Sequence, residues 1–309
     1  MGIDVLALGG NAILKENEPR TFENQNSNVK ATSKSIAELL SSGILESALV
    51  THGNGPQVGD EILKNEYASA EVPRLPMDAI NAETEGFIGS LIVRSLNSEF
   101  KARGMKKEAV CVLTHTIVDR RDPAFEKPTK PVGPFYSYSE LEKELRIERF
   151  EYAKFGNSYR KVVSSPKPVG IVELEAIKSL LKEGFVVVAG GGGGVPVYRS
   201  GNEYIGIACV IDKDATSGLL ASAVGAESLN ILTDVNYVYK NIKDPKSAIK
   251  NATVATMEKL IPSLQEGNIR PKVMACVDFV KRGGKVAKVG NLDRIEDVLN
   301  GKNCTVIRA

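Results

Sequence analysis

Seven short apolar runs, separated by segments with helical periodicity, are the strongest constraint on the fold of this 309-residue chain. Some runs are continuously apolar, such as Phe185-Val186-Val187-Val188-Ala189, which is typical of strands that are covered on both faces in a parallel sheet. The expected strands are Ile3–Leu8, Ser47–Thr51, Val110–Thr114, Phe185–Ala189, Ser228–Thr233, Lys285–Val289 and Cys304–Ile307. Because strands and helices alternate, we predict an α/β fold with helices on both sides of a mainly parallel sheet.

The composition excludes several classes of protein. A net charge of +2 gives no bulk attraction to nucleic acid or to a membrane surface. No apolar run reaches about 18 residues, so we expect no membrane span. The four cysteines are far apart in the sequence and are expected to be reduced core residues of a cytoplasmic protein, and two histidines are too few for a histidine-based metal site.

One region interrupts the alternation of strand and helix. Residues from about 115 to 168 are rich in proline, charge and aromatic side chains, and connections of this length are rarely structureless. We therefore predict a small lid subdomain, inserted into an N-terminal lobe of residues 1–210. Residues 211–309 are then expected to form a C-terminal lobe.

Glycine-rich turns follow three of the expected strands. Gly9-Gly10-Asn11 follows the first, Gly53-Asn54-Gly55 follows the second, and residues 190–194 are five consecutive glycines. In an open parallel sheet, ligands bind beyond the carboxyl ends of the strands, where free backbone N–H groups can hold anionic oxygens. Each turn alone is also compatible with a tight connection that binds nothing. Five glycines in a row are conformationally costly, and packing alone is a poor reason for them.

The glycine spacing excludes two familiar nucleotide sites. No GxxxxGK[ST] sequence occurs, and Gly59 lies one residue too late to complete a GxGxxG dinucleotide fingerprint with Gly53 and Gly55. A nicotinamide-dependent oxidoreductase is therefore a poor candidate.

Three lysines have contexts that favour phosphoryl transfer, which requires positive charge at the transferring oxygens. Lys130 lies between prolines, Lys213 lies between two aspartates before a helix, and Lys272 follows Pro271 at another helix start. We expect Asp214 to orient Lys213 and a neighbouring lysine. The alternatives are that these lysines are solvated surface residues, and that Asp212 or Asp214 caps the helix.

Taken together and in their order along the chain, the motifs resemble those of the carbamate kinases in the amino-acid kinase superfamily. The matching segments are residues 7–12, 51–59, 118–119, 122–125, 128–136, 191–196, 211–214 and 232–235. The stretch PTKPVGPFY at 128–136 is similar to the protruding subdomain of carbamate kinases, which other superfamily members lack.

The resemblance implies a three-layer αβα sandwich around an eight-stranded, mainly parallel sheet, and a homodimer. It implies the reaction ATP + carbamate ⇌ ADP + carbamoyl phosphate with Mg²⁺, and a place in arginine metabolism. Carbamate is its own nucleophile, so no general base is required, and His52 is expected to make a structural hydrogen bond. No protein ligand is assigned to Mg²⁺, which is expected mainly on the nucleotide phosphates.

The resemblance also implies that the lobe of residues 1–210 binds carbamate and the phosphoryl group, and that the lobe of residues 211–309 binds nucleotide. It further implies roles for individual residues. The catalytic residues are Lys130, Lys213, Lys272 and Asp214. The substrate-binding residues are Gly9, Gly10, Asn11, Gly53, Asn54 and Gly55. The nucleotide-binding residues are Gly191, Lys213, Thr233, Asp234, Val235, Tyr239 and Lys272.

Three positions depart from the family pattern. Arg270 stands where glycine is usual beside the nucleotide, Glu85 where glutamine is common, and Ser164 where proline is frequent. Two alternatives stay open. One is another small-acid or phosphate kinase of the superfamily, such as acetylglutamate or isopentenyl phosphate kinase, against which the proline-rich segment with Lys130 argues. The other is a nucleotide-binding regulator without turnover, for which Arg270 and Glu85 leave room.

Overall fold

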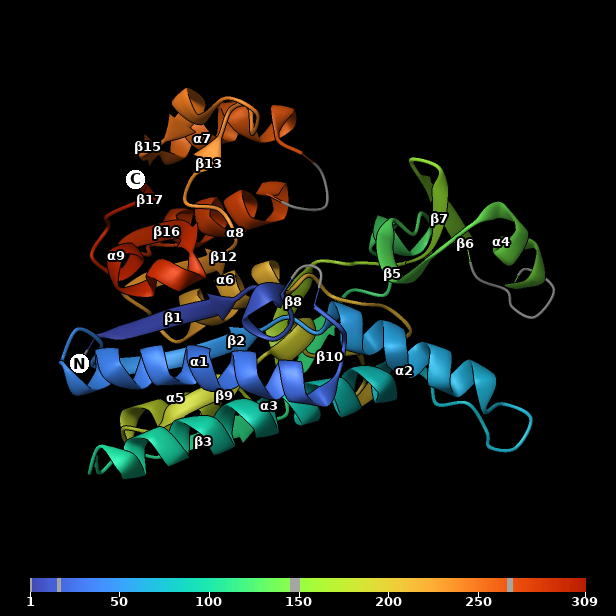
Figure 1. Cartoon of the computed structure of the whole chain (residues 1–309), viewed down its shortest axis with the longest axis horizontal. Coiled ribbons are helices and arrows are strands. Elements are labelled where there is room, and N and C mark those ends of the chain that lie inside the picture. The colour runs from blue at the N-terminus through green and yellow to red at the C-terminus, as the bar shows by residue number, and fades with distance from the viewer. Residues whose placement is uncertain (1, 16–17, 145–150, 266–268) are drawn as a thin grey trace.

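A continuous eight-stranded sheet forms the centre of the molecule, which the computed structural model describes over residues 2–15, 18–144, 151–265 and 269–309 (Figure 1). Its strand order is β15-β17-β16-β12-β1-β2-β9-β3. These strands are β1 (Ile3–Leu8), β2 (Ser47–His52), β3 (Ala109–Val112), β9 (Val186–Ala189), β12 (Ser228–Thr233), β15 (Asn251–Thr253), β16 (Val286–Asn291) and β17 (Cys304–Arg308). All neighbours are parallel except β16 and β17, which confirms the expected mainly parallel sheet.

All seven expected strands belong to this sheet, with small differences at their ends. Strand β3 ends at Val112 rather than at Thr114, because the Thr114 hydroxyl turns back to donate to the Val112 carbonyl oxygen at 2.7 Å. The eighth strand, β15, was not predicted. It has three residues, Asn251–Thr253, and no apolar run that would indicate a strand.

Helices cover both faces of the sheet and complete three layers. Residues of β1 alternate between the two cores: Val5 and Ala7 pack into one, and Leu6 and Leu8 into the other. This alternation explains why a strand buried on both sides is a continuous apolar run. One face is covered by α5 (Leu174–Lys182), α6 (Lys213–Ala223), α7 (Val254–Leu260) and α8 (Ile269–Lys281). The other face is covered by α1 (Phe22–Ser41), α3 (Met77–Ala102) and α9 (Ile295–Leu299).

The interrupted region contributes to two smaller sheets. A four-stranded sheet has the order β11-β10-β4-β8, with β4 (His115–Val118), β8 (Pro168–Ile171), β10 (Val195–Ser200) and β11 (Glu203–Gly206). A three-stranded sheet has the order β5-β7-β6, with β5 (Lys130–Tyr136), β6 (Glu151–Phe155) and β7 (Ser158–Val163). With α4 (Tyr138–Glu144) it forms a subdomain that protrudes from the main body (Figure 1). The division into two lobes at residue 210 stays a prediction.

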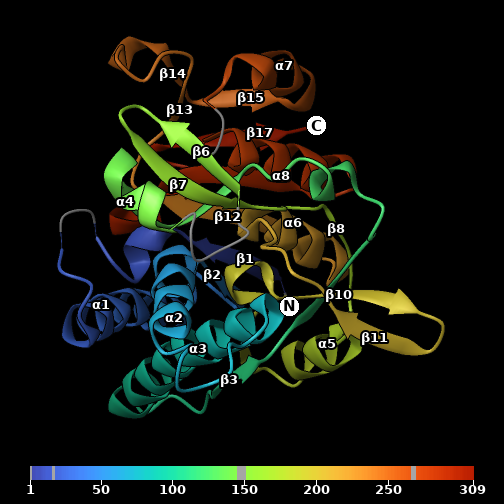
Figure 2. The ribbon, with the colours of Figure 1, turned by 90° about the vertical axis from the view of Figure 1, so that its right-hand side faces the viewer.

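Helix α2 (Gly55–Tyr67) anchors this protruding subdomain. Figure 2 shows the helix and the subdomain from the side on which the subdomain protrudes. A Cβ atom on Gly59 of α2 would lie 2.6 Å from the Cα atom of Gly133 in β5, so the two backbones are in direct contact. Lys161 of β7 forms an ion pair with Glu66 of α2 at 2.8 Å, and its side chain is almost fully buried. Since β5 begins at Lys130, these contacts also fix the position of that lysine.

The hairpin of β13 (Val238–Tyr239) and β14 (Ala248–Ile249) completes the described strands. Among the helices of the described residues, none is both long enough and apolar enough to cross a membrane.

Candidate active site

The glycine turns meet at one edge of the sheet because their strands are neighbours. Strands β12, β1, β2 and β9 are consecutive and parallel in the sheet. The Gly9 N–H donates to the Leu232 carbonyl oxygen at 2.8 Å, and the Gly53 N–H donates to the Leu8 carbonyl oxygen at 3.2 Å. These bonds tie the turns after β1 and β2 to the neighbouring strands.

A cavity of about 170 Å³, called here the inner cavity, lies at this edge. It is bounded by the first turns of three helices, through Gly55 of α2, Lys213 and Asp214 of α6, and Lys272 of α8. Helix N-termini carry a partial positive charge and point unpaired N–H groups outward, so they favour anions. The other lining residues are Gly53, Asn54, Val58, Lys130, Pro131, Val132, Gly192, Val210, Ile211, Asp212 and Pro271.

The three predicted lysines converge on this cavity and are held by two aspartates. Lys213 Nζ lies 2.8 Å from Asp214 Oδ1, and Lys272 Nζ lies 3.0 Å from Asp214 Oδ2. Lys130 Nζ lies 2.6 Å from Asp212 Oδ2. Three ammonium groups and two carboxylates leave one net positive charge in the cavity wall, in addition to the helix N-termini. This arrangement suits a ligand with several negative charges.

Burial and these ion pairs determine the pKa values of the cluster. Burial alone would raise the pKa of Asp214, but the charges of Lys213 and Lys272 outweigh it and hold that pKa below its usual range. Burial lowers the pKa of Lys213, which attraction to Asp214 only partly offsets. Burial also opposes the charge on Lys272, but Asp214 outweighs it and raises the Lys272 pKa. Asp214 thus favours the charged form of both lysines, and its effect outweighs burial at Lys272 but not at Lys213.

Asp212 was considered in the sequence only as a helix cap, and the structure gives it two contacts. Its Oδ1 accepts hydrogen bonds from the N–H groups of Asp214 at 2.9 Å and Ala215 at 3.4 Å, so it caps α6. Its Oδ2 accepts from Lys130. The ion pair across 82 residues has no local sequence signal, because it depends on the subdomain reaching over the main sheet.

The five-glycine turn corrects one argument from the sequence, because packing does explain it. Gly190, Gly192, Gly193 and Gly194 all have positive φ angles. A Cβ atom on Gly192 would lie 2.0 Å from Asn54 Nδ2, and one on Gly193 would lie 2.4 Å from the Ile211 carbonyl oxygen. The N–H groups of Gly193 and Gly194 are already bonded within the turn. The turn therefore shapes the cavity wall more than it supplies free N–H groups.

Two buried polar side chains, those of Glu85 and His52, lie directly beside Gly191 of this turn. Glu85 of α3 accepts a hydrogen bond from the Gly191 N–H at 3.0 Å through Oε1, and burial raises its pKa to about 8. His52 Nδ1 lies 3.1 Å from the Gly53 carbonyl oxygen, which agrees with the expected structural role. Burial lowers the His52 pKa to about 4, so the ring is neutral at pH 7.

The remaining predicted residues do not line the inner cavity. Gly9, Gly10 and Asn11 follow β1, and Lys213 Nζ reaches the same strand end, 3.4 Å from the Ala7 carbonyl oxygen. Thr233, at the end of β12, donates to the carboxylate of Asp234. The predicted nucleotide-binding residues beyond the wall are Gly191, Thr233, Asp234, Val235 and Tyr239, and their role stays a prediction.

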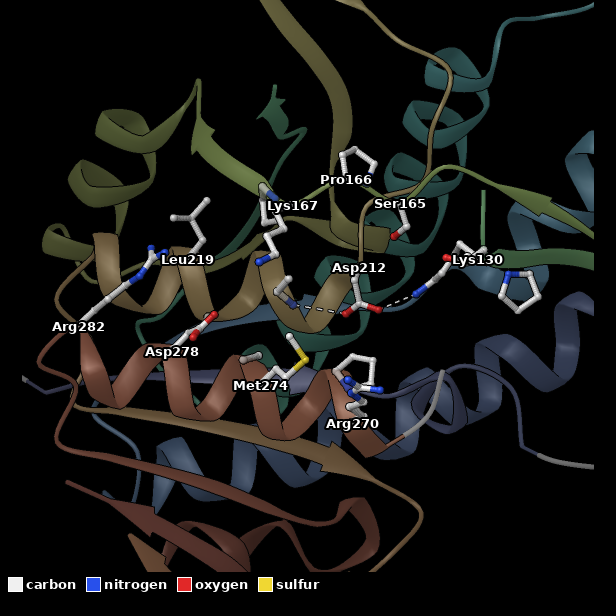
Figure 3. A pocket seen from close by; sticks show the side chains of 17 residues that line it. Lys130, Ser165, Pro166, Lys167, Asp212, Leu219, Arg270, Met274, Asp278 and Arg282 are labelled. Carbon is white, nitrogen blue, oxygen red and sulfur yellow. Dashed lines mark hydrogen bonds and ion pairs between the residues drawn. The ribbon is translucent and has the colours of Figure 1, made fainter. Parts of the chain in front are cut away.

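The three departures have different surroundings. Glu85 accepts a hydrogen bond from the Gly191 N–H in the five-glycine turn. The Ser164 carbonyl oxygen accepts a hydrogen bond from the Val210 N–H at 3.0 Å. Arg270 lies in the first turn of α8 and faces a second, larger cavity (Figure 3). Gly267 and Asn268, which shortly precede it in the sequence, lie outside the described residues.

Comparison with known proteins identifies the family. The profile described as the amino acid kinase family matches residues 3–291, almost the whole chain. The chain belongs to the amino acid kinase family. Within this family it is 41% identical over 310 residues to a carbamate kinase of Pyrococcus horikoshii and 43% identical over 313 residues to one of Trichomonas vaginalis, with 98% of each chain covered in both cases.

A solved structure supports the same placement within the amino acid kinase family. It is described as carbamate kinase from Giardia lamblia bound to AMP-PNP and has a TM-score of 0.91 and 34% identity. The match covers 99% of this chain and 98% of the other. The predicted resemblance to carbamate kinases is thereby confirmed over the whole chain.

Proposed function

We propose that this amino acid kinase is an ATP-dependent carbamate kinase that catalyses ATP + carbamate ⇌ ADP + carbamoyl phosphate in the inner cavity. The observation that carries the proposal is the meeting of Lys130, Lys213 and Lys272 in one small cavity of a chain that is similar to carbamate kinases from end to end. Phosphoryl transfer needs little covalent help from protein, and depends mostly on positioning and on cations at the transferring oxygens.

The proposed roles follow from where each cation is held. Lys213 and Lys272 bind the nucleotide phosphates and are kept charged by Asp214. Lys130 approaches from the protruding subdomain and binds the transferring group. Gly9, Gly10, Asn11, Gly53, Asn54 and Gly55 hold carbamate and the phosphoryl group through backbone N–H groups and the two amide side chains.

The nucleoside is proposed to lie beyond the end of β12. Thr233, Asp234, Val235 and Tyr239 line that part of the site, with Gly191 near the phosphates. Tyr239 packs edge-on against Tyr237, with ring centroids 6.2 Å apart, which provides an aromatic surface at this end.

Mg²⁺ is proposed to be held mainly by the nucleotide phosphates. Within the described ranges, no three His, Cys, Asp or Glu side chains come together as a ligand set, and Asp212 and Asp214 are each engaged by lysine. Mg²⁺ commonly binds through substrate phosphates with only one or two carboxylates, so this site fits an ion that arrives with ATP and neutralises its phosphate charge.

No residue is proposed as a general base. Carbamate carries its own anionic nucleophile, and the neighbouring histidine, His52, is fully buried with a lowered pKa. We further propose a cytoplasmic homodimer that acts in arginine metabolism, as the similarity to carbamate kinases suggests.

The test is ATP formation from ADP and carbamoyl phosphate with Mg²⁺, beside parallel assays with acetylglutamyl phosphate and with isopentenyl diphosphate. We expect ATP from carbamoyl phosphate alone. ATP from one of the other two donors instead would favour a different kinase of the family. ADP binding without turnover on any of the three would favour a regulator.

A further inference from the structure

A second cavity, of about 530 Å³ and called here the outer cavity, lies beside the inner cavity. It lies between α6, α8 and the segment 165–168 that leads into β8 (Figure 3). Its lining residues are Thr129, Lys130, Pro131, Ser165, Pro166, Lys167, Pro168, Asp212, Ala215, Gly218, Leu219, Arg270, Pro271, Met274, Ala275, Asp278 and Arg282. Cavities of several hundred Å³ with mostly apolar walls are typical small-molecule sites.

The outer cavity combines an apolar floor with a cationic rim. Leu219 of α6 and Met274 of α8 face it from adjacent helices (Figure 3), and Met274 remains 36% exposed. Four cationic side chains line it against two carboxylates, an excess of two positive charges. They are Lys130, Lys167, Arg270 and Arg282, against Asp212 and Asp278.

Two of these cations are available to a ligand. Within the part of the chain that the structure describes, the side chains of Lys167 and Arg282 form no ion pair, and both residues are exposed. In Figure 3, Lys167 points across α6 into the cavity, and Arg282 lies at the end of the cavity opposite Lys130. A ligand with an apolar body and an anionic group would satisfy both features of the cavity.

We propose that the outer cavity binds a small organic anion with an apolar body, and that its occupancy inhibits phosphoryl transfer. The inhibitory part rests on the proposed role of Lys130. The two cavities share four lining residues, Lys130, Pro131, Asp212 and Pro271. Two of these residues, Lys130 and Asp212, form an ion pair 2.6 Å long (Figure 3).

The shared ion pair couples the two sites. An anion in the outer cavity competes with Asp212 for Lys130 and draws the ammonium group out of the inner cavity. A substrate phosphoryl group draws Lys130 the other way. Because each ligand favours a different position of one side chain, each weakens the binding of the other.

Binding is tested with 1-anilinonaphthalene-8-sulfonate, an aromatic sulfonate, on the full chain saturated with ADP. We expect saturable fluorescence that the double variant K167E/R282E weakens roughly tenfold or more, since two charged contacts are reversed. The matched control K106E/K302E reverses two exposed lysines outside both cavities and should bind as the wild type does. Neutral 1-anilinonaphthalene should bind weakly to all of them.

The coupling is tested by the rate of ATP formation from ADP and carbamoyl phosphate. The sulfonate should raise the KM for carbamoyl phosphate in the wild type but not in K167E/R282E, whose rate without the probe should be unchanged.

If the wild type and K167E/R282E bound the probe with equal affinity, or if ADP displaced the probe, the proposed binding site would be contradicted. If the probe bound but left the KM for carbamoyl phosphate unchanged, the proposed coupling of the two cavities would be contradicted. A wild type without turnover would refute the proposed function and, with it, the inhibitory part, while the binding comparison would still decide the site itself.

Discussion

At the scale of single residues, the central feature is one aspartate shared by two buried lysines. Asp214 has both carboxylate oxygens engaged, and its side chain is only 5% exposed. Breaking a buried ion pair is costly because it leaves an uncompensated charge. In this protein the cluster keeps two cations at fixed positions before any phosphate arrives, so little reorganisation is needed when phosphate binds.

Lys130 should be needed for turnover and not for ADP binding. It comes from the protruding subdomain and forms its ion pair with Asp212, which also caps α6. We expect Lys130→Ala to lower the rate of ATP formation by roughly 10²- to 10³-fold, as removal of a transition-state donor does, with little change in the Kd for ADP. The exposed lysine Lys127 provides the control: Lys127→Ala should behave as the wild type, and an unchanged rate in Lys130→Ala would remove Lys130 from the mechanism.

Glu85 should make stability fall as pH rises. Burial raises its pKa to about 8, against 4.5 for an exposed glutamate. Between these values the folded protein holds a proton that the unfolded chain has lost, so stability falls by up to ~1.4 kcal/mol per pH unit. Below pH 4.5 both states are protonated, and above about pH 8 both are ionised, so the contribution is constant outside this window.

The measurement is the urea midpoint of unfolding at pH 5.5 and pH 8.5. Glu85→Gln keeps the acceptor for Gly191 but cannot ionise, so its midpoint should fall less than that of the wild type between the two pH values. Glu83→Gln, an exposed change on the same helix, should follow the wild type. If the urea midpoints of all three proteins fell equally between the two pH values, Glu85 would not be buried in its protonated form.

At the scale of elements, the contact between α2 and β5 couples the subdomain to the site. Gly59 and Gly133 touch through their backbones, and β5 starts at Lys130. Gly59→Ala should force α2 and β5 apart, cost roughly 1–3 kcal/mol of stability and lower turnover by displacing Lys130.

The control for this variant is Gly86→Ala in α3, where nothing lies within 4 Å of the added Cβ. That change should leave activity intact and slightly raise the free energy of unfolding, because alanine favours helix. Thermal unfolding and ATP formation are measured for both variants. Equal effects of the two changes would show that the close contact at Gly59 does not matter.

The elements differ in how far sequence alone could predict them. Strands such as Val186–Ala189 are buried on both faces, so their residues form a continuous apolar run that is easily recognised. Strand β15 is short and polar, and it pairs only with β17 at the edge of the sheet, so its sequence has no such pattern. The Lys130–Asp212 and Glu85–Gly191 contacts join residues 82 and 106 positions apart, and no local spacing indicates them. The lysines themselves were predictable because prolines, acids and helix starts mark their positions in the chain.

At the scale of the whole molecule, one sheet carries both parts of the site. Strand β1, which leads to Gly9 and Gly10, pairs directly with β12, which leads to Thr233 and Asp234. The inner cavity also takes residues from α2, α6, α8 and the protruding subdomain. A ligand that joins these segments should therefore stabilise the whole fold and not one part of it.

Global stabilisation by ADP follows from this arrangement. ADP at about 100 times its Kd, with Mg²⁺, should raise the free energy of unfolding by ~2.7 kcal/mol in a single cooperative transition. AMP, which lacks the β-phosphate that Lys213 and Lys272 are proposed to bind, should give a smaller shift at equal concentration. A second transition that ADP leaves unmoved would show that the parts unfold independently.

The most direct test of the central claim, that lysines in the inner cavity carry phosphoryl transfer, is the single-turnover rate of ATP formation in Lys213→Met beside Lys288→Met. Both changes remove a largely buried lysine, but only Lys213 lies in the inner cavity, whereas Lys288 of β16 donates to the Leu299 carbonyl oxygen at 2.8 Å. Thermal unfolding confirms that each variant is folded. We predict a loss of about 10²-fold or more for Lys213→Met and a near wild-type rate for Lys288→Met. A folded Lys213→Met protein that forms ATP at the wild-type rate would contradict the account.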